Sequence, residues 1–180
     1  SAKPPKHFDL IVKPLKSRNL GEAHIEVKRI YLNSLSLTNS TNRLEQFDRV
    51  FVHEMAHVAV QYRHWFPISW SSDLPAAGYW SESIADFAHY KLIGSNGWSC
   101  PECSLAFPHY TSGYTCGGAF LLHLDANYGT NIVRQLTREL HQRTYTDEFF
   151  TKATGKKLDT LWSEFQLTGA VKPLALEVIQ

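Results

Sequence analysis

The feature that most constrains the fold is a stretch in which apolar side chains recur every three or four positions. These positions are Leu44, Phe47, Phe51, Met55 and Val58. This spacing places the side chains on one face of an α-helix. Asn42 precedes the run and Glu45 follows three residues later, as in a capping pair that begins a helix. The sequence therefore predicts a long amphipathic helix over residues 43–62.

The predicted helix carries a His-Glu-x-x-His pattern at His53, Glu54 and His57. Residues four apart on a helix differ by about 40° and 6 Å of rise, so both imidazoles can reach one ion at the roughly 2.0–2.1 Å that zinc prefers. Glu54 points about 100° away from His53, which suits a general base acting on a metal-bound water. The spacing predicts two metal ligands and a base on one helix.

A third ligand is available twenty-five residues after His57, where Glu82 and Asp86 lie one turn apart near the expected start of a second helix. Glu82 would complete a two-histidine, one-glutamate zinc set, and Asp86 would accept the remaining N–H of a ligand histidine. The alternative is that Glu82 is stabilised by a helix N-terminus and that Asp86 is solvated. His64 is the main competing ligand. His89 lies about 10 Å along the helix axis and is expected to be structural.

The rest of the chain has an α+β pattern. Short β-rich runs at residues 8–12 and 25–32 predict a small N-terminal sheet, and the second run, as a sheet edge, could pair with a substrate backbone. One domain is expected over residues 1–180, with residues 1–20 as a surface lead-in. Further helices are expected at residues 81–94, 114–128, 130–141, around Phe149 and Phe150, and at 157–167.

The amino-acid composition argues against nucleic acid and membranes as binding partners. Eighteen Lys and Arg against seventeen Asp and Glu leave a formal charge of +1, which provides no basic field for nucleic acid or an anionic membrane. No apolar stretch reaches the roughly 20 residues of a membrane span. We expect a monomer that binds neither.

Two features favour a secreted protein. Asn39 begins a glycosylation sequon, and the cysteines lie close enough in the chain for one disulfide. Which two of Cys100, Cys103 and Cys116 pair is open. A zinc site made of these cysteines and His109 is the less favoured use.

Several motifs in this order resemble the basic secretory protein peptidases of plants, fungi and bacteria. They are His-Glu-Met-x-His-Val at 53–58, Glu-Ser-Ile-Ala-Asp-Phe at 82–87, Gly-Tyr at 113–114, Asp-Glu-Phe-Phe at 147–150 and Leu-Asp-Thr-Leu-Trp at 158–162. The resemblance covers about residues 28–166, and the Glu-x-x-x-Asp element is similar to that of the gluzincins, which include thermolysin-like peptidases.

The resemblance implies a zincin-like fold and a secreted zinc peptidase acting on peptides or proteins. One zinc ion would be held by His53, His57 and Glu82, with Glu54 as the base and Asp86 behind the ligands. The chain departs from the family in a shorter segment before the histidine motif, a longer Trp-rich spacer between His57 and Glu82, and a near-neutral charge.

Two further site predictions concern substrate. The resemblance places Tyr114 at the mouth of a helix, where its hydroxyl would stabilise the oxyanion; the alternatives are a buried aromatic, or Tyr110 or His109 as the donor. Residues 63–79 carry Trp65 and Trp70, which either line a substrate pocket or pack as a satellite core.

The expected function is that of a zinc-dependent metalloendopeptidase in which Glu54 deprotonates a zinc-activated water. One alternative is a secreted zinc-containing binding or effector protein with narrow or no proteolytic activity, although an intact Glu54 argues against a dead enzyme. Another is a zinc hydrolase of a non-peptide amide or a glycan-linked substrate, because stacked tryptophans also suit sugars.

Overall fold

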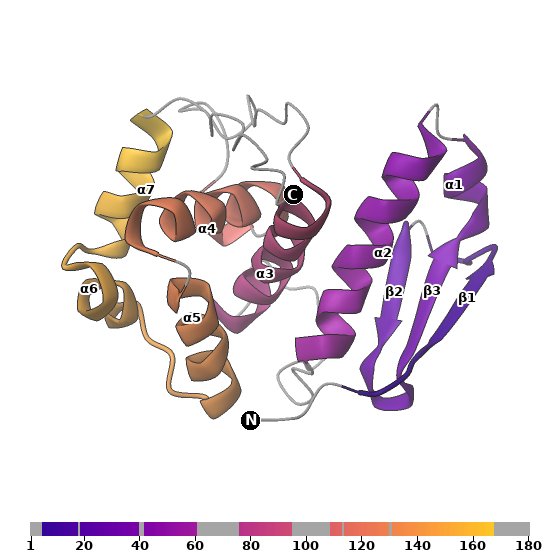
Figure 1. Cartoon of the computed structure of the whole chain (residues 1–180), viewed down its shortest axis with the longest axis horizontal. Helices are drawn as coiled ribbons and strands as arrows, with labels where there is room; N and C mark the ends of the chain where they lie inside the picture. The colour runs from indigo at the N-terminus through magenta and orange to yellow at the C-terminus, as the bar shows by residue number, and fades with distance from the viewer. Residues whose placement is uncertain are drawn as a thin grey trace, which may run out of the picture. The chain divides into compact units, whose positions relative to one another are not determined.

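The computed structural model describes residues 5–17, 19–39, 42–60, 76–94, 109–112, 114–129 and 131–167. The chain divides into two compact units, Ser1–Pro67 and Ile68–Gln180. Among the described residues, the first unit holds one small sheet and two α-helices, whereas the second holds only helices (Figure 1). The expected α+β class is confirmed. A single domain over residues 1–180 stays a prediction.

The sheet of the first unit consists of β1 (Asp9–Lys13), β2 (Gly21–His24) and β3 (Arg29–Asn33). Its order is β1-β3-β2, with β1 parallel and β2 antiparallel to β3. The prediction that residues 25–32 form an edge strand is therefore wrong, because β3 is paired on both sides. The run is broken where the 3-10 helix η1 (Ile25–Val27) ends at Lys28, whose φ of 54° is left-handed.

Helix α2 (Arg43–Val60) packs on one face of this sheet. It begins as predicted, because the Asn42 side-chain amide donates a hydrogen bond to the Glu45 carboxylate. Leu44, by contrast, is 79% exposed and takes no part in the core. The shared core consists of buried Ile30, Leu32, Val50 and Val58, with partly buried Phe8, Ala23, Leu37, Phe47, Phe51 and Met55 packed against it.

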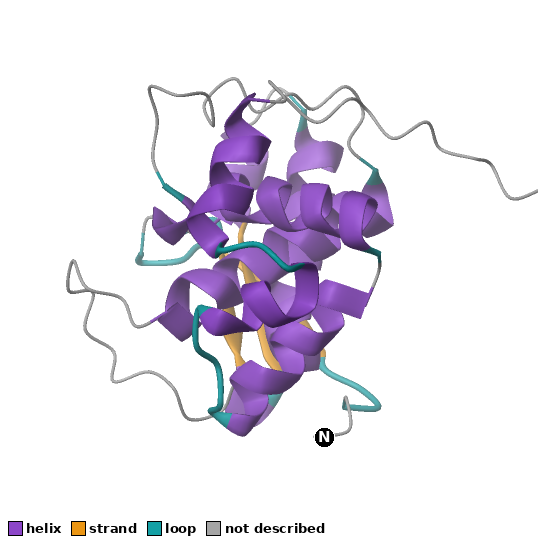
Figure 2. Ribbon diagram, turned by 90° about the vertical axis from the view of Figure 1, so that its left-hand side faces the viewer, coloured by secondary structure: helices purple, strands orange, loops and turns teal. Residues whose placement is uncertain are grey.

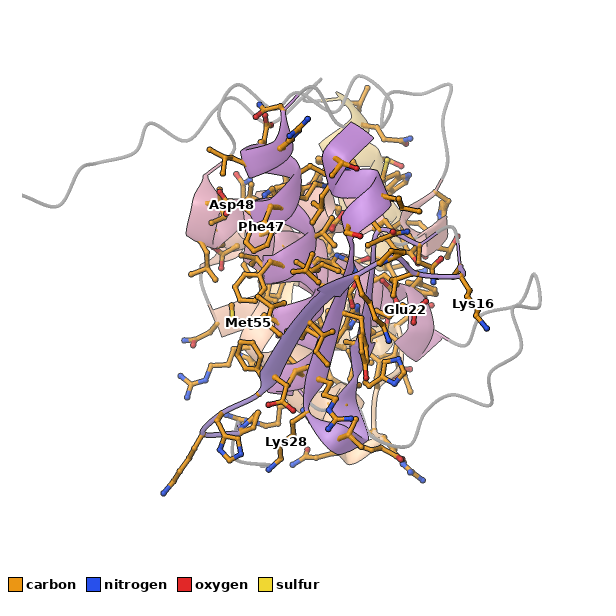
Figure 3. The ribbon with its side chains drawn as sticks, turned by 90° about the vertical axis from the view of Figure 1, so that its right-hand side faces the viewer. Lys16, Glu22, Lys28, Phe47, Asp48 and Met55 are labelled. Carbon is orange, nitrogen blue, oxygen red and sulfur yellow. The ribbon has the colours of Figure 1, made fainter. Side chains whose placement is uncertain are left out.

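The opposite face of the sheet is polar, and it faces the viewer in Figure 3, where Glu22 is labelled. The Ser17 hydroxyl donates to Glu22 Oε1 at 2.5 Å, and Lys13 Nζ lies 4.3 Å from the centre of the Tyr31 ring. A short helix not expected from the sequence, α1 (Ser34–Asn39), follows β3. It begins where Asn33 Oδ1 accepts the backbone N–H of Leu35 at 3.2 Å.

The second unit is built around α3 (Ala76–Ile93) and α4 (Tyr114–Tyr128), whose contact is the most extensive between any two helices of the described residues. Figure 2 shows the helices in purple and the strands in orange. The predicted bounds hold to within a few residues except for α3, which begins at Ala76 rather than near 81. None of the helices in the described part of the chain is long and apolar enough to cross a bilayer. The other elements are η3 (Tyr110–Ser112), α5 (Asn131–Gln142), α6 (Glu148–Thr154) and α7 (Leu158–Leu167).

Aromatic residues fill the core of this unit. Trp80 of α3 is fully buried and stacks on Tyr110 of η3, with ring centres 5.7 Å apart and planes 4° apart. The family-like motifs near the C-terminus also supply core side chains. These are Phe149 and Phe150 of α6 and Leu158, Leu161 and Trp162 of α7.

Candidate metal centre

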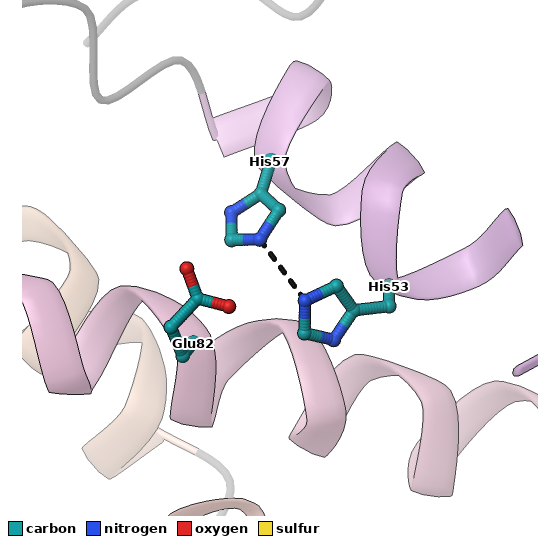
Figure 4. A group of neighbouring side chains, drawn as sticks. All are labelled: His53, His57 and Glu82. Carbon is teal, nitrogen blue, oxygen red and sulfur yellow. Dashed lines mark hydrogen bonds between the residues drawn. The ribbon is translucent and has the colours of Figure 1, made fainter. Parts of the chain in front are cut away.

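The two motif histidines lie side by side on α2. Their Nε2 atoms are 3.1 Å apart, and their ring planes meet at 79° (Figure 4). Two imidazole ligands of one tetrahedral zinc are separated by roughly 3.3 Å when each bond is about 2.05 Å long. The pair formed by His53 and His57 is therefore spaced so that both Nε2 atoms can reach one ion. In the absence of an ion, the same separation allows one ring to donate a hydrogen bond to the other.

Glu54 follows His53 on α2, and its side chain is turned toward β2. Glu54 is only 8% exposed. At Gly21, the first residue of β2, a Cβ atom would stand 2.9 Å from Glu54 Cγ and 3.0 Å from Oε1. The backbone of β2 thus forms one wall of the space that holds the carboxylate.

Glu82 and Asp86 lie on α3 in the second unit. Glu82 is half-buried and stands six residues after Ala76, so it is too far from the helix N-terminus for the dipole explanation. Asp86 is 2% exposed, and Thr115 Oγ1 donates to its Oδ2 at 3.3 Å. The alternative in which Asp86 is a solvated side chain is therefore wrong.

Of the three oxyanion candidates, Tyr114 and His109 are exposed and Tyr110 is buried. Tyr114 is 40% exposed and begins α4 with a left-handed φ of 44°, which excludes the buried-aromatic alternative. The Tyr110 hydroxyl donates to Asp159 Oδ1 at 3.2 Å, and burial, reinforced by the charge of Asp159, raises the pKa of Tyr110. Tyr110 is a core residue with its hydroxyl already engaged.

Two other predictions fall on described residues. His89 is 9% exposed and lies against the Tyr90 ring, as expected for a structural histidine. Tyr79, expected in the connecting loop, is instead a buried residue of α3. Burial, followed by the charge of Asp147, raises the pKa of Tyr79 to about 12, so its hydroxyl stays neutral.

Several predicted residues lie outside the described residues: His64, Trp65, Trp70, Cys100 and Cys103. Cys116 is buried in α4, and a disulfide between two of the three cysteines stays a prediction. Asn39 ends α1, whereas Ser40 and Thr41 of its sequon are outside the described residues.

Sequence reasoning missed two residues that touch the acidic side chains of the site. Gly21 contacts Glu54, and Thr115 contacts Asp86. Each pair joins elements far apart in the chain, so no local spacing or periodicity indicates the contact.

The profile of a protein family described as peptidases of plants and bacteria matches residues 15–165. The chain belongs to this family. The matched residues include β2, α2, α3 and α4. They therefore include Gly21, both motif histidines and Tyr114. Membership indicates a peptidase with peptide or protein substrates. No curated protein and no solved structure has significant similarity to the chain.

Proposed function

We propose that this peptidase is a zinc-dependent metalloendopeptidase that holds one zinc ion per chain through His53, His57 and Glu82. The observation that carries the proposal is the pair of Nε2 atoms 3.1 Å apart on α2, within the region matched by a peptidase family. Two imidazoles and one carboxylate could hold a metal ion. This set matches the ligands of catalytic zinc sites, which leave one position open.

Zinc in such a site would polarise the scissile carbonyl and lower the pKa of a water molecule beside it. Glu54 takes a proton from the attacking water as the oxygen adds to the carbonyl carbon. When the carbon–nitrogen bond breaks, Glu54 passes that proton to the leaving amine. The burial of Glu54 against β2 holds the carboxylate in one place for both transfers.

Two other residues assist in this proposal. Asp86, buried on α3, accepts the second N–H of a ligand histidine and so fixes that ring. Tyr114 donates its hydroxyl to the oxyanion. Support for Tyr114 is its exposure at the start of α4 and its left-handed backbone, since residues held in such conformations cluster at functional sites.

The substrate backbone is proposed to pair with β2 rather than β3. Since β3 already has a neighbour on each side, only β1 and β2 are edges of the described sheet, and β2 is the edge that contacts Glu54.

Trp65 and Trp70 are proposed to line the pocket for the substrate side chain. Trp65→Ala or Trp70→Ala should then change kcat/KM in a substrate-dependent way. An equal loss for every peptide, with a lower Tm, would make this segment core instead.

The experiment is a cleavage profile on a complex peptide library for the parent, with and without a chelator, and for Glu54→Gln. We expect chelation to abolish cleavage and Glu54→Gln to reduce kcat by roughly 100-fold or more with zinc still bound. Asp48→Asn also replaces a carboxylate of α2 by an amide. It is the control and should cleave like the parent. Glu54→Gln activity within about tenfold of the parent would overturn the general-base role.

Secretion, with glycosylation at Asn39, is part of the proposal and is tested by the glycan content of protein collected from culture medium.

A zinc-loaded parent that cleaves no peptide would favour the binding or effector alternative. Cleavage confined to glycopeptides or non-peptide amides would favour the other hydrolase alternative.

A further inference from the structure

Gly21 of β2 lies close to the candidate base. A Cβ atom built there would stand 2.6 Å from Val50 Cγ1, 2.9 Å from Glu54 Cγ and 3.0 Å from Glu54 Oε1. Carbon atoms in ordinary van der Waals contact are about 3.5–4.0 Å apart. Any side chain at position 21 therefore forces Val50, Glu54 or β2 itself to move.

The backbone conformation does not explain why glycine stands here. Gly21 is paired with Leu32 in the antiparallel ladder, and it is not among the glycines with positive φ. Ala23, two residues on and on the same face of β2, carries a Cβ and packs in the core. Neither position 21 nor position 23 has a positive φ, so they differ in the space available for a side chain.

The two neighbours of Gly21 differ in how easily they can move. Val50 is 5% exposed, belongs to the core cluster, and as a β-branched residue has one strongly preferred rotamer in a helix. Glu54 has more rotatable bonds, and its carboxylate is the far end of the side chain. A methyl group at position 21 would therefore displace the Glu54 carboxylate before it displaced Val50.

We propose that Gly21 is a positioning residue for the general base: the bare backbone of β2 confines Glu54 to the rotamer in which it transfers protons. This inference rests on the proposed function, since it assigns Gly21 a part in the same reaction. A catalytic group misplaced by about 1 Å can cost roughly 100-fold in rate. The three atoms nearest to the added Cβ belong to Val50 and Glu54 and not to a histidine ring, so the metal is expected to stay.

The first test is Gly21→Ala in the zinc-loaded chain. We expect kcat to fall by roughly 10 to 100-fold, with KM and zinc content close to those of the parent. Ala23→Gly is the matched control, because it alters the same face of the same strand without adding an atom near Glu54. Parent-like kcat in Gly21→Ala would overturn the proposal.

A second test separates positioning from a general loss of structure. Val50→Ala removes the closest contact, at 2.6 Å, and leaves both contacts with Glu54. In the Val50→Ala background, Gly21→Ala should therefore cost less stability and still lower kcat. Recovery of kcat together with stability would mean that Gly21 serves packing only. The comparison of Val50→Ala with and without Gly21→Ala also serves if Gly21→Ala alone does not fold.

A double-mutant cycle shows whether Gly21 acts through Glu54. When Glu54→Gln has already removed the base, adding Gly21→Ala should cause no further loss of residual activity. If Gly21→Ala lowered activity by the same factor in both backgrounds, the inference would be contradicted.

The last readout does not depend on activity. In the metal-free chain, the loss of unfolding free energy caused by Gly21→Ala should shrink when Glu54 is changed to Ala, because two of the three crowded atoms are then gone. An equal loss in both backgrounds would overturn the contact itself. A zinc-loaded parent without peptidase activity would instead overturn the proposed function, and it would be recognised in the parent before any variant was made.

Discussion

The two units hold the acidic side chains of the proposed site by different kinds of packing. In the first unit α2 lies on a sheet, and Glu54 faces the strand backbone at Gly21. In the second unit α3 lies along α4, and Asp86 faces the helix backbone at Gly118, where a Cβ would stand 2.7 Å from Asp86 Cβ. In both units a glycine stands directly behind a buried acidic residue.

The atoms that these glycines approach explain why the two contacts should respond differently to crowding. Gly21 approaches Val50 Cγ1, and it also approaches Cγ and Oε1 of Glu54, which can rotate away. Gly117 and Gly118 approach the side-chain ends of Ser83 and Tyr90, but they also approach Ser83 Cβ, Asp86 Cβ and the Phe87 backbone nitrogen, whose positions are fixed by the helix itself. Crowding in the first unit should therefore cost activity, whereas crowding in the second should separate two helices and cost stability.

The largest effect is expected from removing a ligand in the first unit. His57→Ala leaves only one imidazole on α2, so zinc and peptidase activity should both be lost, as they should in His53→Ala. The measurement is zinc per chain together with kcat/KM. His24→Ala, on the polar face of β2, is the control and should keep both. Stoichiometric zinc in either motif variant would mean that the site lies elsewhere.

Gly117→Ala tests the contrast in the second unit. The added Cβ would stand 1.9 Å from Ser83 Oγ and 2.8 Å from Ser83 Cβ. Overpacking of this kind costs about 1–3 kcal/mol, partly offset by the better helix propensity of alanine. Denaturant unfolding should show the loss, and Ser83→Ala should relieve part of it. If Gly117→Ala instead lowered kcat at unchanged stability, the contrast between the two units would fail.

A smaller effect is expected at Asp86. Asp86→Asn keeps the size of the side chain but weakens it as an acceptor, so zinc affinity should fall by roughly 10 to 100-fold. Thr115→Val removes the hydroxyl that donates a hydrogen bond to Asp86. It should also lower the zinc affinity, by a smaller factor. Competition with a chelator of known affinity measures both. Unchanged affinity in Asp86→Asn would limit Asp86 to a packing role.

The smallest effect is expected on the polar face of the sheet, away from either glycine contact. The hydrogen bond from Ser17 lowers the pKa of Glu22, and Ser17→Ala should raise that pKa toward its ordinary value. A lowered folded-state pKa contributes stability above the unfolded pKa that is lost as the pH falls through the folded one. The variant should therefore be slightly less stable at neutral pH and equal to the parent in acid. NMR titration of Glu22 checks the shift, and peptidase activity should not change.

The sequence predicted best the elements with strong local signals. Two local signals predicted α2: the apolar periodicity of residues 43–62 and the pair of Asn42 and Glu45. Both motif histidines lie on this helix. Gly129, with a φ of 89°, marks the end of α4. Such signals lie within one element and need no tertiary contact.

The elements missed by sequence reasoning depend on contacts with other parts of the chain. β2 has only four residues, including Gly21 and His24, and it is a strand because it pairs with β3. The early start of α3 had one usable signal, Pro75, since proline favours the first turn of a helix, but Gly78 obscured it. The contacts of Gly21 and Thr115 carry no sequence signal.

The central claim is that two histidines of α2 and Glu82 hold one zinc ion, and its most direct test is the metal itself. The chain should be purified without chelator and examined by elemental analysis and zinc X-ray absorption. The account predicts one zinc per chain with two imidazole nitrogens and carboxylate oxygen among its ligands, and loss of the carboxylate contribution in Glu82→Ala. A chain with no transition metal and no uptake of added zinc, or a zinc ion bound by sulfur, would contradict it.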